Sequence, residues 1–86
     1  MVSKKEFDKI IGGNDTKSIE KVNREAESEI IKNSKVIGGL RNKIETESNE
    51  LLKNILEEQL EFHEGILKWN EYVYKRSMSK IMELTE

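Results

Sequence analysis

Apolar side chains recur every eleven residues through the second half of the chain. Eleven residues span three turns of an α-helix at 3.67 residues per turn, so side chains at this spacing stay on one side of the helix. The pattern predicts one long helix over residues 39–86. The main ladder is Leu40, Leu51, Phe62, Val73 and Leu84, and two ladders run beside it, Ile44, Ile55, Ile66 and Leu56, Leu67, Met78.

A short helix and a turn are predicted over residues 1–13. Ser3 and Glu6 have the spacing of a capping box, in which each side chain accepts a hydrogen bond from the backbone of the other residue. Phe7, Ile10 and Ile11 then give the helix one apolar side. Gly12-Gly13 is expected to end it, because glycine readily adopts the left-handed conformation at a C-terminal cap.

A second helix is predicted over residues 14–38. Its start is marked by Asn14, Asp15 and Thr16, residue types that cap helices well. Its apolar stripe is narrow, so the helix needs a partner to pack against. The stripe consists of Ile19, Val22, Ala26, Ile30 and Ile37, with Asn33 at the remaining position.

Gly38-Gly39 allows two interpretations. A reversal at the glycines would lay the second helix against the long one as a helical hairpin, which is the interpretation we favour. Alternatively, a continuous helix passes through them at a cost of about 1 kcal/mol per glycine. Ile37, Leu40 and Ile44 keep helical phase across the glycines, which is consistent with the second interpretation.

The predicted length of the last helix indicates self-association. Forty-five residues at 1.5 Å each would span roughly 67 Å, whereas a compact chain of this size has a radius of gyration near 12 Å, by the usual scaling. The second helix could cover only about half of such a rod. We therefore predict an all-α fold of the helical hairpin or coiled-coil type, assembled as an oligomeric bundle, with a homodimer favoured.

Three polar residues interrupt the apolar stripe at the same eleven-residue spacing. They are Ser48, Gln59 and Asn70. Either they lie at the edge of the stripe in water, or they form polar layers in a bundle that fix its register and chain number.

A cluster of aromatic side chains marks a candidate interface in the long helix. Trp, Tyr and Arg are enriched at binding hot spots, because they bury a large area at low entropic cost. The same residues could instead widen the core of a self-associated bundle. The predicted interface residues are Phe62, Ile66, Trp69, Tyr72, Val73 and Arg76.

Composition excludes several classes of protein. The chain has 86 residues, 37% of them charged, and contains no cysteine, so it has neither disulfides nor thiolate metal sites. No apolar run approaches the roughly 20 residues that cross a bilayer. Residues 1–8 lack the apolar stretch of a signal peptide, and a cytoplasmic location is expected.

No constellation of residues indicates catalysis or a cofactor. His63 is the only histidine, and position 60, where a Glu-x-x-His site would need a carboxylate, is Leu60. Neither glycine pair has the Lys-Ser/Thr or the third glycine of a phosphate-binding loop. We expect no enzyme activity, no cofactor and no metal.

Charge is unevenly distributed although the net charge is only −2. Residues 45–64 carry seven acidic side chains against Lys53 alone, a net charge of −6, whereas residues 1–44 carry +3 and residues 65–86 carry +1. Such a band is either an ordinary solvated helix surface or a means of antiparallel or offset docking. Acidic residues interleave the basic ones, so nucleic-acid binding is poorly supported.

These features together predict a non-catalytic protein–protein interaction module. It would act as a small regulator or assembly adaptor with a protein partner, as many phage and bacterial accessory proteins do. One alternative is a dimeric DNA-binding regulator that uses N-terminal basic residues, and another is a structural or scaffold subunit. The DNA-binding alternative would use Lys4, Lys5, Lys9, Lys17, Lys21 and Arg24.

Overall fold

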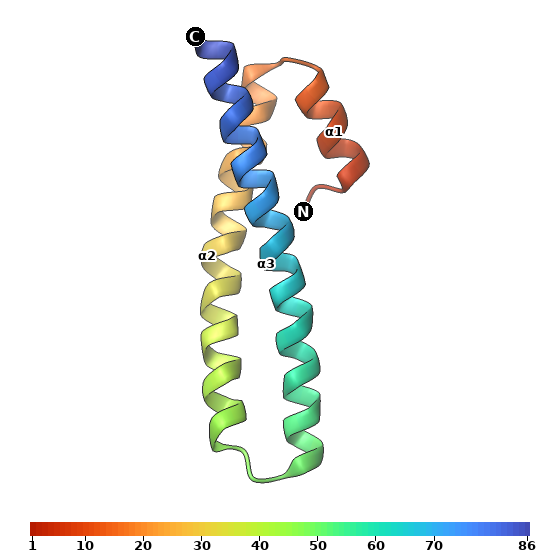
Figure 1. Ribbon diagram of the computed structural model, residues 1–86, viewed down its shortest axis with the longest axis vertical. Helices are drawn as coiled ribbons and strands as arrows, with labels where there is room; N and C mark the ends of the chain where they lie inside the picture. The colour runs from red at the N-terminus through yellow and green to blue at the C-terminus, as the bar shows by residue number, and fades with distance from the viewer.

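The computed structural model covers residues 1–86 and contains three α-helices and no strand. They are α1 (Lys4–Gly12), α2 (Thr16–Thr46) and α3 (Glu50–Thr85). The prediction of an all-α fold is confirmed. α2 and α3 form an antiparallel hairpin, and α1 folds back beside its open end (Figure 1). None of the helices is long and apolar enough to cross a membrane.

α1 begins and ends where predicted, but the conformation at its end differs from the prediction. The Ser3 hydroxyl accepts a hydrogen bond from the Glu6 amide at 3.2 Å. The helix ends at Gly12 with Gly13 as its C-cap, as expected. Gly13 has right-handed helical angles, however, so the expected left-handed glycine is wrong; the left-handed residue is Asn14, with φ of 55°. Asparagine tolerates this conformation better than most residues, which explains how it can turn the chain toward α2.

α2 passes through Gly38-Gly39 without interruption, so the favoured reversal at the glycines is wrong. Continuing the helix keeps Ile37 and Leu40 on one side, where both are buried, with 4% and 8% of their surface exposed. Burial of two aliphatic side chains contributes about 1.5–3 kcal/mol each, which offsets the weak helical propensity of the two glycines.

The chain reverses instead at Glu47–Asn49, and the predicted helix over residues 39–86 is divided there. The Asn49 side chain accepts a hydrogen bond from the Leu52 amide at 3.2 Å and caps α3. The Glu47 carboxylate accepts from the Asn49 amide at 3.0 Å. These side chains satisfy backbone donors that a helix start leaves free, so a three-residue turn suffices.

Because the chain turns here, α3 is not longer than α2 can cover, and the predicted length no longer indicates self-association. α2 has 31 residues and α3 has 36, so each covers nearly the full length of the other. The molecule measures 54 × 21 × 14 Å, with a radius of gyration of 16.4 Å. It is an elongated hairpin, and any case for self-association must come from its surface.

The core is thickest at the open end of the hairpin, where three helices meet. There the side chains of all three helices form a continuous apolar cluster, whereas toward the turn only α2 and α3 remain (Figure 1). The buried members of the cluster are Phe7, Ile11, Ile19, Val22, Ala26 and Val73.

Candidate interaction surface

Two polar contacts join α2 to α3 inside the hairpin. The first lies near the open end, where the Asn23 amide donates to Ser77 Oγ at 2.9 Å and to the Tyr74 carbonyl at 3.2 Å. Asn23 and Ser77 are both buried. Because the bonds join residues more than 50 positions apart, they fix the register of the two helices.

The second polar contact lies closer to the turn. His63 Nδ1 is 3.0 Å from Asn33 Oδ1, and the Asn33 amide nitrogen donates to the Glu29 carbonyl at 2.8 Å. An amide oxygen only accepts, so this arrangement places a hydrogen on His63 Nδ1. His63 thus has a structural partner, and no group of three or more potential metal ligands surrounds it.

Two aromatic side chains of α3, Trp69 and Tyr72, lie beneath α1. Phe7 packs edge to face on Trp69 and Tyr72, with ring centroids 6.1 and 5.9 Å apart. Trp69 stacks on Tyr72 at 5.6 Å, and its indole Nε1 donates to the Val2 carbonyl at 3.0 Å. These contacts attach α1 to the hairpin.

The predicted interface residues therefore fall into two groups. Trp69, Tyr72 and Val73 contact or lie beneath α1 of the same chain, and Val73 is only 1% exposed. Phe62, by contrast, is 65% exposed. Ile66 and Arg76 are half-buried. The sequence pattern marked a contact surface but could not show that part of it is covered by the N-terminal helix.

The uncovered part of this surface is apolar and lies toward the turn. Leu51 and Phe62 share the eleven-residue ladder with Val73 and so lie on the side of α3 that α1 covers at the open end. We define the distal face as Val36, Leu40, Leu51, Ile55 and Phe62. Leu51 is 70% exposed, Ile55 44% and Val36 42%; only Leu40, on α2, is buried.

The other predicted stripe positions have different surroundings. The ladder of Leu56, Leu67 and Met78 is half-buried, whereas Leu84 is exposed near the end of α3. Leu40 and Ile44 belong to α2, not to the helix that carries the other ladder residues.

Of the three candidate register positions, only Asn70 is buried. Its amide donates to the Ile66 carbonyl at 2.9 Å and to the Met1 sulfur at 3.3 Å. Ser48 lies in the turn and Gln59 is exposed on α3. The buried amides that do join the two long helices are Asn23 and Asn33. Neither belongs to the polar series of Ser48, Gln59 and Asn70, so that series does not mark them as register positions.

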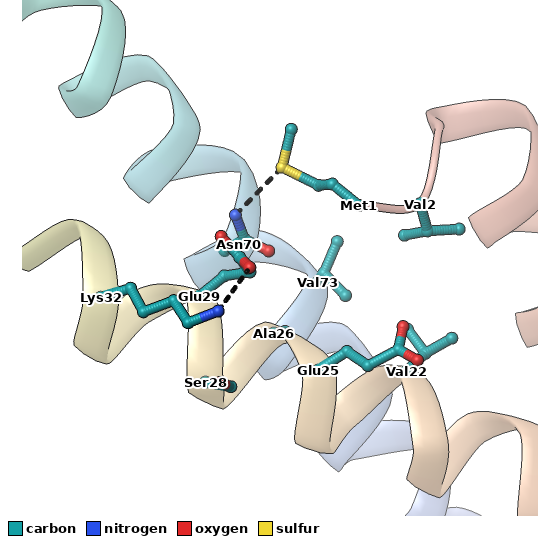
Figure 2. A pocket seen from close by; sticks show the side chains of 10 residues that line it. All are labelled: Met1, Val2, Val22, Glu25, Ala26, Ser28, Glu29, Lys32, Asn70 and Val73. Carbon is teal, nitrogen blue, oxygen red and sulfur yellow. Dashed lines mark hydrogen bonds and ion pairs between the residues drawn. The ribbon is translucent and has the colours of Figure 1, made fainter.

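A hollow of about 360 Å³ lies where the N-terminus meets the hairpin (Figure 2). Met1 and Val2 form one wall, and α2 and α3 form the others. Its polar rim includes Glu29, whose carboxylate is 4.0 Å from the Lys32 ammonium group.

The acidic band gathers at the turn end of the hairpin, because residues 45–64 form the turn and the first part of α3. The one ion pair between the two long helices joins Arg41 to Glu64 at 3.2 Å, and both side chains are exposed. Exposed pairs of this kind contribute about 0–1 kcal/mol. The remaining carboxylates of the band make no ion pair within the chain.

Comparison with known proteins gives no identification: no protein family, curated protein or solved structure matches the chain.

Proposed function

We propose that this chain is a non-catalytic helical interaction module that self-associates through the distal face and serves as a small regulator or assembly adaptor. The observation that supports the proposal is the exposure of Leu51, Ile55 and Phe62 on one side of α3. Exposed apolar side chains that are contiguous on a helix surface are typical of protein–protein contact sites.

The arrangement of the molecule suits this role. α1 already packs on the same side of the hairpin nearer the open end, which supports the docking of a further helix beside it. Between the start of α1 and the turn, only α2 and α3 are present (Figure 1). A further helix packed on them there would bury the exposed Leu51 and Phe62. Burial of such a side chain contributes about 1.5–3 kcal/mol.

A nucleic-acid regulator is less well supported by the surface. The basic residues of α1 and of the start of α2 do lie at one end of the molecule, and they are exposed. However, residues 1–24 contain six basic and four acidic side chains, a net charge of only +2. A gel shift with duplex DNA at low salt and micromolar protein would support this alternative, and its absence would exclude it.

The test of the proposed function is the mass of the particle in solution. We expect sedimentation equilibrium between about 1 and about 100 μM, the range for a small interface, to show a mass rising toward twice the chain mass of 10.0 kDa. Phe62→Glu should remain monomeric with an unchanged helical circular dichroism spectrum, because a charge on the distal face opposes its burial.

The matched control is Ile31→Glu. Ile31 is 52% exposed and lies nine residues before Leu40, which places it on the opposite side of α2. It should dimerise like the unmodified chain. A monomer at every concentration would exclude self-association, and growth beyond a closed oligomer would favour a scaffold subunit.

A further inference from the structure

We infer that the distal face is covered by a second copy of the chain in antiparallel orientation, so that the acidic turn of each copy lies beside the α1 end of the other. The inference rests on the proposed function and specifies its partner and geometry. The two-fold axis would cross the middle of the uncovered part of α3.

The uncovered length sets the overlap of the two copies. The residues before α1 reach α3 at Trp69 and Asn70, through the contacts of Val2 and Met1. From Glu50 to Lys68, α3 runs for about 30 Å without such a contact. A second hairpin packed antiparallel over this length would bring its turn beside the start of α1 of the first copy.

The area of this overlap is sufficient for a specific dimer. Two neighbouring helices, each about 10 Å across with their side chains, present a face about 20 Å wide. An overlap of about 30 Å would therefore bury roughly 600 Å² on each copy, or about 1,200 Å² in total. That value is at the lower end of stable protein–protein interfaces. A buried area of this size is typical of a weak dimer whose two copies associate and dissociate readily.

Charge selects the antiparallel orientation. A parallel dimer would place all seven acidic side chains of residues 45–64 beside those of the other copy. The antiparallel dimer separates the three nearest the turn, Glu45, Glu47 and Glu50, from their copies. It sets them beside a partner region that includes Lys4, Lys5 and Lys68, all of them exposed. Complementary placement of charge fixes orientation and register in helical assemblies.

Gln59 is suited to the position near the two-fold axis. It is exposed and lies about midway along the uncovered length, three residues from Phe62 and four from Ile55. A residue on the axis meets its own copy, and a glutamine amide can both donate to and accept from an identical amide. Gln59 can therefore pair with Gln59 of the second copy where the two-fold axis brings the two residues together.

The orientation can be measured with single spin labels, because the chain contains no cysteine. A label on Ser48→Cys, in the turn, should lie about 36 Å from its copy along the antiparallel bundle, twice the rise over twelve residues. In a parallel dimer the same pair would lie within about 20 Å, two helix diameters. A label on Gln59→Cys should lie within about 20 Å of its copy in the antiparallel dimer.

A charge-reversal variant gives an independent readout of opposite sign for the two orientations. Glu50→Lys should weaken an antiparallel dimer about fivefold, the combined effect of two exposed charge pairs, one at each end of the overlap. It would strengthen a parallel dimer by relieving repulsion between the turns. Glu20→Lys makes the same change of charge on an exposed residue outside the overlap and should leave the dissociation constant unchanged.

Each outcome decides between the two proposals. A dimer with distant Ser48 labels, close Gln59 labels and a weakened Glu50→Lys variant supports the antiparallel arrangement. A dimer with close Ser48 labels overturns this inference and leaves the proposed self-association intact. A particle that stays monomeric at every concentration overturns both, and the distal face would then belong to a different protein.

Discussion

Asn23 shows how a single buried amide can align two helices. Its side chain is 7% exposed and spans the interface to reach Ser77 Oγ and the Tyr74 carbonyl. A buried donor that is satisfied contributes about 0.5–1.5 kcal/mol, whereas an unsatisfied one costs about 1–3 kcal/mol. Sliding α2 along α3 would break both bonds at once.

We expect Asn23→Asp to lower the free energy of unfolding by about 1–3 kcal/mol, because the new carboxylate has no hydrogen to donate and faces a carbonyl oxygen. Urea denaturation followed by circular dichroism measures the change. Asn54→Asp is the control, since Asn54 is exposed on α3 and surface changes are usually within about 0.5 kcal/mol. Equal stability of the two variants would mean that Asn23 does not hold the register.

At the scale of the element, the eleven-residue ladder predicted which side of α3 makes contacts, but the end points of the helices required other information. The reversal at Glu47–Asn49 depends on side-chain caps, and Ser48-Asn49 does carry a cap signal in the sequence. That signal competes with Gly38-Gly39, which is a more obvious helix breaker. Burial of Ile37 and Leu40 on one side decided in favour of the continuous helix.

The double variant Gly38→Ala, Gly39→Ala should raise the free energy of unfolding by about 1–2 kcal/mol, since alanine has the higher helical propensity. A methyl group added at either glycine would have no neighbouring atom within 4 Å. Thermal denaturation measures the effect. Gly12→Ala, at the last residue of α1, should give a smaller gain, and a loss of stability in the double variant would indicate a turn at the glycines.

The attachment of α1 depends on one side chain above the others. Phe7 is fully buried and contacts both Trp69 and Tyr72. Phe7→Ala should cost about 3–5 kcal/mol, as in other phenylalanine cores, and should release α1 from the hairpin.

Trp69 is the only tryptophan, so its fluorescence reports this release as a shift to longer wavelength. Ile31→Ala, on an exposed site, should leave the emission unchanged. An unshifted spectrum in Phe7→Ala would show that α1 is held by its other contacts.

At the scale of the whole molecule, the sequence predicted helices and an apolar surface but not how the chain covers that surface itself. The docking of α1 on Trp69 joins segments at opposite ends of the chain, and helical periodicity carries no information on such contacts. No single rod forms, because the chain reverses at Glu47–Asn49. The expected dimer therefore rests only on the exposure of Leu51, Ile55 and Phe62.

We expect the melting temperature to rise with protein concentration, because association stabilises the folded state by mass action. A tenfold increase in concentration should raise it by about a few degrees for a chain of this size. Differential scanning calorimetry at several concentrations measures the shift. Phe62→Glu should melt at one temperature throughout, and a concentration-independent melt of the unmodified chain would contradict dimerisation.

The hydrogen bond between Val2 and Trp69 has a consequence for folding during synthesis on the ribosome. It joins residues 67 positions apart, so the contact cannot form until α3 has been synthesised as far as Trp69. Until then α1 can pack only on α2, through Ile19 and Val22. The final place of α1 is therefore set late in translation.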